Sequence, residues 1–305
     1  MKSIAIVGAG AVGLYYGGRL AAAGGDVRFL VRSDYEALRR DGLRVASVAG
    51  DFALARPAVF RSARDIGPVD LAVVAWKATA NRMLGDVLPP LLHAQTRVLT
   101  LQNGLGNCEA LAAIVGAERV LGGLCFVCLN RLAPGFVRHT AGGSVSVGAA
   151  GADPHGWAGA VARRLTAAGV PCERVDDLAA AQWQKLLWNV PFNGLAIAEG
   201  GVTTADLLAV PAIEAEARAL MHEVVAAARG LGFALDDALI DWNIERTRPM
   251  GAYRPSSMID FVAGREVEVE AIWAEPIRRA RAAGVPVPRM ERLLDRIRRR
   301  LAARG

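Results

Sequence analysis

The sequence predicts an α/β N-terminal domain built on a doubly wound sheet, followed by a second domain that is entirely helical. Short apolar segments alternate with helical segments as far as about residue 176, and a glycine-rich turn follows the first of them. From about residue 178, long Ala-, Leu-, Glu- and Arg-rich segments with helical spacing replace the strand patterns. Alternating strands and helices are typical of a mostly parallel sheet covered by helices. We therefore expect a sheet domain over residues 1–176 and a helical domain over residues 177–305.

The N-terminal elements begin with a βαβ unit of about thirty residues. Ile4–Val7 has the apolar pattern of a buried strand, an Ala- and Leu-rich helix follows to about Gly24, and Val27–Val31 is the next strand. The other expected strands are Leu71–Ala75, Val98–Leu101, Leu121–Leu129 and Val145–Val147, and the other expected helices are 79–93, 107–116 and 156–168.

The C-terminal elements are predicted to be helices only, because their apolar residues recur at helical spacing and glycine or proline separates them. The expected helices are 178–198, 204–230, 235–246, 257–282 and 288–303.

Composition excludes several classes of protein. Hydrophobic residues make up 53% of the chain, yet no uninterrupted apolar run reaches the roughly 18 residues that a membrane span needs. The apolar N-terminal stretch is interrupted by glycines, so we do not expect a signal peptide, and we expect a cytoplasmic protein. Of the four cysteines, Cys125 and Cys128 form a C-x2-C inside an apolar segment without a nearby histidine, which predicts core cysteines and no metal site.

The net charge of +6 first suggests a nucleic-acid partner. The arginines are scattered, however, and the one dense run, Arg292 to Arg304, is typical of a solvated helix face. We expect neither a nucleic-acid nor a membrane partner, and the basic balance suits small anionic ligands.

The glycine-rich turn has the pattern G-x-G-x-x-G and lies between a predicted strand and a predicted helix. In such a turn the first glycine permits the tight bend, the second lets the backbone approach a pyrophosphate, and the third lets the helix pack against the strand. The N-terminus of the helix then attracts the phosphates. This predicts a Rossmann-type dinucleotide site formed by Gly8, Ala9, Gly10, Ala11, Val12 and Gly13.

The end of the second strand predicts which dinucleotide is bound. Sites that prefer NAD place an acid there, on the ribose 2′-hydroxyl. Here the strand ends in Arg32-Ser33, and the planar, permanently charged guanidinium of Arg32 suits a 2′-phosphate. We therefore predict NADP(H) as the cofactor, although Asp34 lies nearby and complicates the prediction.

Lysines are rare in this chain, with three against 33 arginines, so the two internal ones invite a chemical explanation. Lysine can titrate and deliver a proton, which arginine effectively cannot. Lys77 follows a predicted strand, as does Asn103, and ligands of doubly wound folds bind at such strand ends. A surface lysine is the alternative for Lys77.

Lys185, Asn189 and Asn193 are spaced i, i+4, i+8 in an otherwise apolar, Trp-rich segment. On a helix they form one polar stripe, which should face water or a polar ligand because burying it unpartnered costs about 1–3 kcal/mol per group. Pro191 is expected to kink this helix and to offset Asn193. A plain solvent-facing stripe is the alternative.

Taken together, these segments resemble the ketopantoate reductase (2-dehydropantoate 2-reductase) family over nearly the whole chain. The matching segments are the Gly8–Gly13 turn, Arg32, Lys77, Gln102–Gly104, Trp183–Asn193, Ser256, Gly264–Glu268 and Arg278–Pro288.

The resemblance implies NADPH-dependent reduction of a 2-oxo acid, with ketopantoate to pantoate in pantothenate biosynthesis as the expected reaction. It implies that Lys185 is the general acid and that Asn103 and Lys77 lie beside the nicotinamide and its ribose. It also implies that Asn189, Asn193, Ser256 and Glu268 bind the substrate. Of two adjacent serines we select Ser256, because its spacing to Glu268 matches that of the family.

The sequence departs from the family at Gly194, where a proline is common, at Val267, where threonine is usual, and at Glu270, where aspartate is usual. These changes could reshape the substrate pocket, so reduction of another branched 2-oxo acid is the first alternative. A redox-sensing NADP-binding protein without catalysis is the second. The apolar composition of the helical domain is compatible with a homodimer.

Overall fold

The computed structural model describes residues 1–304. The chain forms two compact units: Met1–Gln102 with Asn107–Leu178, and Asn103–Gly106 with the chain from Ala179 onwards. The four-residue segment Asn103–Gly106 thus belongs to the second unit, although it interrupts the first in the sequence.

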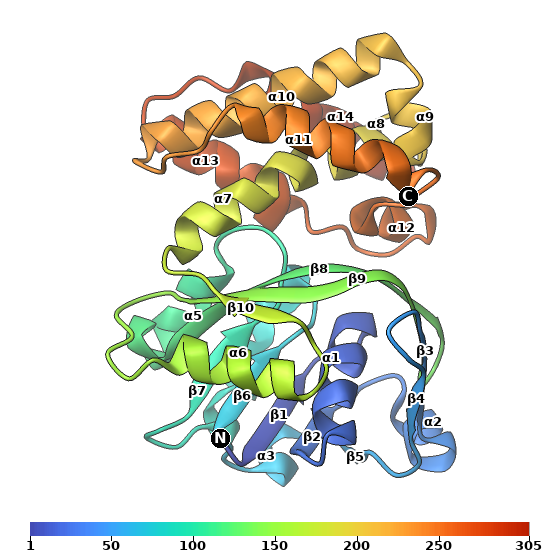
Figure 1. The fold of residues 1–305 in the computed structure, drawn as a ribbon, viewed down its shortest axis with the longest axis vertical. Coiled ribbons are helices and arrows are strands. Elements are labelled where there is room, and N and C mark those ends of the chain that lie inside the picture. The colour runs from blue at the N-terminus through green and yellow to red at the C-terminus, as the bar shows by residue number, and fades with distance from the viewer. Residues whose placement is uncertain (305) are drawn as a thin grey trace. The chain divides into compact units, whose positions relative to one another are not determined.

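The first unit is built on one sheet with strand order β4-β3-β9-β8-β7-β6-β1-β2-β5, and β10 pairs with β9 (Figure 1). From β5 to β8 each neighbouring pair is parallel, whereas β9 is antiparallel to β8 and β4 is antiparallel to β3. The strands are β1 (Ser3–Val7), β2 (Asp26–Leu30), β3 (Leu43–Ser47), β4 (Phe52–Leu54), β5 (Ala58–Phe60), β6 (Leu71–Val74), β7 (Arg97–Thr100), β8 (Val120–Ala133), β9 (Phe136–Ala149) and β10 (Cys172–Arg174). The prediction of a doubly wound sheet is confirmed, with an antiparallel extension that the prediction lacked.

Helices cover this sheet, and α1 contacts α6 while α5 packs against β7 and β8. Their bounds are α1 (Ala11–Ala22), α2 (Tyr35–Asp41), α3 (Ala63–Ile66), α4 (Leu84–Val87), α5 (Asn107–Val115) and α6 (Trp157–Ala167). The helix expected over 79–93 is instead a series of short turns: a 3-10 helix at Ala78–Met83, α4, and a 3-10 helix at Pro89–Leu91. Pro89 and Pro90 have no N–H to donate, so a regular helix cannot continue through them.

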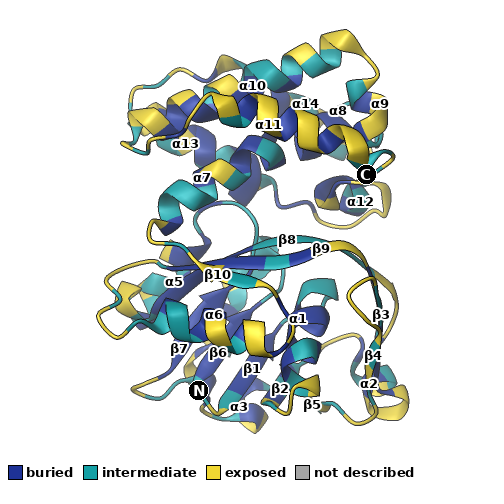
Figure 2. Cartoon of the chain, in the orientation of Figure 1, coloured by how far each residue is buried: buried dark blue, intermediate teal, exposed yellow. Residues whose placement is uncertain are grey.

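The centre of the sheet is the most buried part of the first unit. Every residue of β6 and β7 is buried, as is β1 from Ile4 onwards (Figure 2). The hairpin of β8 and β9 extends beyond the predicted strands into residues that are largely exposed, apart from residues such as Val137 and His139, and that lack the apolar pattern of a buried strand. Burial raises the pKa of the Cys172 thiol to about 12, which disfavours its nucleophilic thiolate form.

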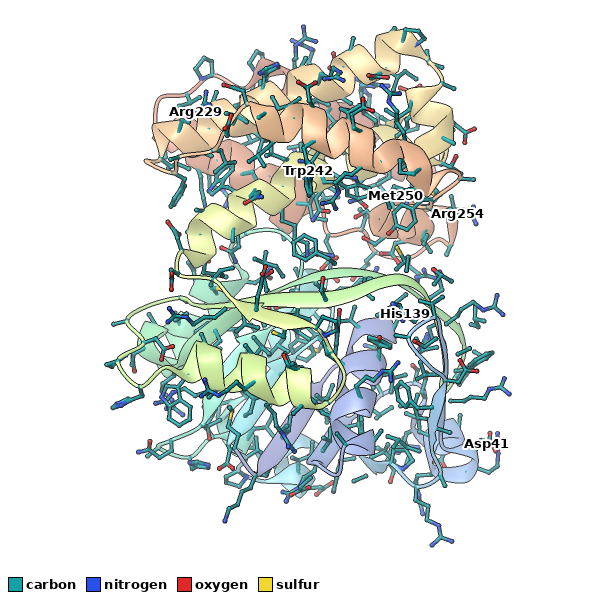
Figure 3. The ribbon with its side chains drawn as sticks, viewed as in Figure 1. Asp41, His139, Arg229, Trp242, Met250 and Arg254 are labelled. Atoms are coloured by element: carbon teal, nitrogen blue, oxygen red, sulfur yellow. The ribbon has the colours of Figure 1, made fainter. Side chains whose placement is uncertain are left out.

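A polar cluster joins β3 and β9 around the buried His139, which is labelled in Figure 3. Its Nδ1 lies 2.8 Å from Ser47 Oγ, and its Nε2 lies 3.0 and 3.1 Å from the carbonyl oxygens of Ala141 and Gly142. Because a carbonyl oxygen only accepts, Nε2 carries the proton and Nδ1 accepts from the Ser47 hydroxyl. Burial lowers the pKa of His139, so the neutral ring is the form that the fold favours.

Among its described residues the second unit contains helices and no strands, as predicted. Its helices are α7 (Leu178–Trp188, which begins one residue before the unit), α8 (Gly194–Ala198), α9 (Thr204–Leu208), α10 (Pro211–Gly230), α11 (Ala238–Thr247), α12 (Ser256–Val262), α13 (Glu275–Ala282) and α14 (Pro288–Ala302). Wider π-helical turns precede α8 and α13, at Asn189–Asn193 and Glu270–Ala274. The segment predicted as one helix over 257–282 is interrupted after α12, and 204–230 divides before Pro211.

The C-terminal arginines bind the second unit's own backbone and carboxylates. Arg296 pairs with Glu199, Arg300 donates to the carbonyl of Ala198, and Arg304 donates to that of Phe261. The basic run is therefore more than a solvated face, since part of it ties α14 to neighbouring elements. Within residues 1–304, none of the helices has the length and apolar character needed to span a bilayer.

Candidate functional site

In the glycine turn of the first unit, two of the three motif glycines are closely packed by neighbouring atoms and one is open. Gly8 has φ +102°, and a Cβ there would lie 2.5 Å from the backbone nitrogen of Trp76. A Cβ on Gly13 would lie 2.1 Å from the carbonyl oxygen of Gly8. Both positions are therefore closed to larger residues by packing within the unit.

Gly10 differs, because a Cβ at this position would meet nothing within 4 Å. It is the N-cap of α1 and offers no side-chain hydrogen bond to the first helical turn. An open surface above an uncapped helix N-terminus is where a pyrophosphate can approach the backbone. Ala9, Ala11 and Val12 are partly exposed beside it, so the predicted turn fits the phosphates of a dinucleotide.

The two charged residues that follow β2, Arg32 and Asp34, have different surroundings. Arg32 is exposed and makes no ion pair or hydrogen bond with any other residue in 1–304. Asp34 is 1% exposed and lies inside the unit, where it accepts from Arg131 Nη1 at 2.7 Å and from the Gly135 N–H at 3.2 Å. The nearby acid that complicated the sequence prediction is therefore occupied by internal partners.

The residues after β6 and β7 are joined by Asn81, which the sequence analysis missed. Its Oδ1 accepts from Trp76 Nε1 at 3.3 Å and from Gln102 Nε2 at 2.8 Å. Its Nδ2 donates to Asn107 Oδ1 at 2.9 Å. Asn81 thus holds the backbone segment that leads into Lys77, a half-buried residue, although no spacing in the sequence distinguishes it from other surface asparagines.

In the second unit, the Lys185 ammonium donates to Asn103 Oδ1 at 2.9 Å. The two residues are 82 positions apart in the chain, and Asn103 follows β7 by three residues. The structure therefore brings together the predicted proton donor and one of the predicted cofactor-binding residues.

The polar stripe on α7 continues into the first π-helical turn. Asn189 is 8% exposed and Asn193 is 1% exposed, so the stripe does not face open solvent. Pro191 explains the widened turn, because it cannot donate to a carbonyl one turn earlier and its ring would clash with an α-helical backbone. The offset expected at Asn193 therefore takes the form of a π-helical turn rather than a break.

Asn193 connects this turn to Ser257, the residue that follows the predicted Ser256. Its Oδ1 accepts from the Ser257 N–H at 2.9 Å, which satisfies one of the unpaired donors at the start of α12. Ser256 is the first residue of α12 and is exposed, whereas Ser257 is buried. Glu268 is 8% exposed and lies two residues before the second π-helical turn. Its backbone carbonyl accepts from the N–H of Ile272, which lies inside that turn, at 3.2 Å.

The three departures from the family pattern have different surroundings. The side chain of Glu270 is 71% exposed and pairs with Arg278 and Arg298 at 3.4 and 3.6 Å, so it belongs to the surface. Val267 is 7% exposed and belongs to the core. Gly194 is buried, and a Cβ there would lie 2.6 Å from the Leu293 side chain and 2.9 Å from the Trp273 indole nitrogen.

Comparisons with known proteins cover both units. The family model described as ketopantoate reductase PanE/ApbA matches residues 4–152, and the model of that family's C-terminal domain matches residues 177–300. A 2-dehydropantoate 2-reductase from a Nostoc species is 36% identical over 304 residues, covering 97% of this chain and 94% of the relative.

The fold agrees with the sequence comparison. The crystal structure of 2-dehydropantoate 2-reductase from Geobacter metallireducens matches with a TM-score of 0.95 and 42% identity, over 97% of this chain and 99% of the other. That from Methylococcus capsulatus matches with a TM-score of 0.89 and 30% identity, over 99% and 97%. The resemblance seen in the sequence is confirmed, and the chain belongs to the ketopantoate reductase family.

Proposed function

We propose that this oxidoreductase reduces a 2-oxo acid to a 2-hydroxy acid with NADPH, and that its substrate is 2-dehydropantoate (ketopantoate), which it converts to pantoate for pantothenate biosynthesis. The observation that carries the proposal is the hydrogen bond of 2.9 Å between Lys185 Nζ and Asn103 Oδ1. It holds a rare lysine at the segment that directly follows the sheet, and ligands of doubly wound folds bind beside such segments.

The cofactor half of the proposal rests on residues of the first unit and on Asn103. The backbone of the Gly8–Gly13 turn would hold the pyrophosphate, and Arg32 would pair with the 2′-phosphate because its guanidinium has no internal partner among residues 1–304. Lys77 and Asn103 would contact the nicotinamide and its ribose. NADPH, when bound, supplies the hydride that reduces the keto carbon.

The chemical half rests on the second unit. Negative charge develops on the keto oxygen as the carbon is reduced, and an ammonium group stabilises that charge and delivers a proton. Lys185 is the proposed donor, and its hydrogen bond to Asn103 orients the ammonium before substrate arrives. A fixed donor does not have to reorganise in the transition state, so orientation contributes to the rate.

Substrate recognition is assigned to Asn189, Asn193, Ser256 and Glu268. Asn189 and Glu268 are nearly buried, so each can act only at a site that excludes most water. The Oδ1 of Asn193 is already used by the Ser257 N–H, so its contribution to the substrate would come from Nδ2. Ser256 is exposed at the first turn of α12 and has its hydroxyl available at the surface of the unit.

The test measures oxidation of NADPH with ketopantoate, beside NADH and beside a straight-chain 2-oxo acid. We expect kcat/KM to be highest for ketopantoate with NADPH. A panel of branched 2-oxo acids checks the first alternative, and a higher kcat/KM for one of them would reject ketopantoate as the substrate. Tight NADPH binding without turnover of any 2-oxo acid would instead support the non-catalytic sensor.

A further inference from the structure

The second π-helical turn, Glu270–Ala274, contacts two separate segments of its unit. On one side the Ala271 carbonyl accepts from the Leu105 N–H at 2.8 Å. A Cβ on Gly104 would lie 2.2 Å from that same carbonyl oxygen, so the segment Asn103–Gly106 packs directly on this turn. On the other side Trp273 Nε1 donates to the Val190 carbonyl at 3.0 Å, inside the first π-helical turn.

These two segments carry the two partners of the lysine hydrogen bond. Asn103 directly precedes Gly104, and Lys185 lies five residues before Val190 on the continuous helical path of α7. Ala271 and Trp273 are two residues apart, so one short turn makes a hydrogen bond to each of the two segments that carry Lys185 and Asn103. We call the hydrogen bonds of Ala271 and Trp273 the clamp. The distance from the ammonium to Asn103 therefore depends on how firmly the clamp holds each side.

The hydrogen bond from the Trp273 indole depends on its burial and on the small residue beside it. Its side chain is 0% exposed, and a buried indole N–H needs an acceptor. Gly194 provides the room, since a Cβ there would lie 2.9 Å from the indole nitrogen. Gly194 is also one of the positions at which this chain departs from the usual pattern of the family, which commonly has a proline there. The glycine and the tryptophan pack against each other.

We propose that Trp273 is a positioning residue for the reaction, which orients the Lys185 ammonium by holding the first π-helical turn through the Val190 carbonyl. The inference rests on the proposed function of Lys185 as proton donor. Trp273 acts on the helix that carries Lys185, and the glycine turn that would bind the phosphates lies in the other unit. Weakening the clamp should therefore lower kcat and leave the KM for NADPH nearly unchanged.

The experiment compares Trp273→Phe, which keeps an aromatic ring but removes the N–H, with Gly194→Ala, which displaces the indole. The control is Ile244→Val on α11, a position that is 0% exposed and loses packing in the same unit. For Trp273→Phe we expect kcat to fall roughly tenfold, since small displacements of a catalytic group are costly, while the KM for NADPH stays within about twofold. Gly194→Ala should give the same pattern, and Ile244→Val should match the wild type in both constants.

A kcat for Trp273→Phe equal to that of the control, or a rise in the KM for NADPH that accounts for the loss, would overturn the proposal. If Trp273→Phe does not fold, the Gly194→Ala variant decides in the same way. Hydrogen exchange of the backbone amides in and directly after the first π-helical turn, at 189–194, provides a readout independent of activity. We expect faster exchange there in Trp273→Phe than in Ile244→Val, and equal exchange in the two variants would reject the clamp. This comparison does not require turnover. A wild-type protein that reduces no 2-oxo acid would reject the proposed function, whereas the exchange result would still decide whether Trp273 holds the turn.

Discussion

The two units hold their candidate site residues by different physical means. In the first unit the phosphate-binding turn is shaped by backbone packing, because Gly8 and Gly13 leave no room for a side chain while Gly10 is open. In the second unit the polar side chains lie on or beside widened helical turns. These turns are held by the hydrogen bond from Trp273 Nε1 to the Val190 carbonyl and by the one from the Ser257 N–H to Asn193 Oδ1. A site formed by the backbone of a glycine-rich turn can be predicted from the spacing of its glycines. A site formed on irregular helices depends on contacts between segments that are distant in the sequence, which the spacing does not record. The first unit should therefore govern cofactor affinity and the second should govern the chemical step.

Lys185→Ala gives the largest expected effect and tests that division directly. Loss of the proton donor should lower kcat by about 10² to 10⁴, while the Kd of NADPH, measured by fluorescence titration, stays near the wild-type value. The matched variant is Lys77→Ala in the first unit, which should raise the KM for NADPH by a larger factor than it lowers kcat. Unchanged turnover of Lys185→Ala would remove this residue from the mechanism.

The same substitution, glycine to alanine, should lower stability at Gly13 and weaken NADPH binding at Gly10. Gly13→Ala places a methyl group 2.1 Å from the Gly8 carbonyl oxygen, so it should reduce the free energy of unfolding by about 1–3 kcal/mol. Gly10→Ala places its methyl group in open space, so the melting temperature should stay close to that of the wild type. Its Kd for NADPH should nevertheless rise by roughly tenfold, because the methyl group blocks the close approach of the pyrophosphate.

Thermal unfolding and NADPH titration of the two glycine variants separate the effects. Equal Kd values for Gly10→Ala and the wild type would show that the dinucleotide does not approach the backbone at this turn.

Arg32→Gln tests how the first unit selects its cofactor. Removing the exposed guanidinium should raise the KM for NADPH by about tenfold and leave the KM for NADH nearly unchanged, because only NADPH carries the 2′-phosphate. The companion variant Asp34→Asn should cost about 1–3 kcal/mol of stability, since it weakens a buried acceptor of the Arg131 and Gly135 donors. It should not change the ratio of the two KM values, and a shift toward NADH or NADPH would show that Asp34 contacts the ribose after all.

Particular residues show why the sequence predicted some of the molecule and not the rest. The βαβ unit and the helices of the second unit follow from apolar periodicity, and the family follows from motifs in the right order. The strands β3, β4 and β5, of which β4 and β5 lie at the edges of the sheet, were missed because they are short and partly exposed. Asn81 and Trp273 were missed because their roles come from partners 21 and 83 residues away, and residue spacing along one element does not record such contacts. The site residues themselves, from Lys185 to Glu268, remain predictions.

The smallest expected effect concerns the acid stability of the first unit, in which His139 is buried. Because burial lowers the pKa of His139 in the folded chain, the unfolded chain takes up this proton first, near its ordinary pKa of about 6.5. The free energy of unfolding should therefore fall as the pH drops below about 6.5, and this contribution should level off below the folded-state pKa. His139→Gln should reduce the slope of melting temperature against pH between about 7 and 5, whereas the exposed His155→Gln should retain the wild-type slope. Equal slopes for the two variants would mean that the cluster of His139, Ser47 and the Ala141 and Gly142 carbonyls does not couple proton binding to the stability of the sheet.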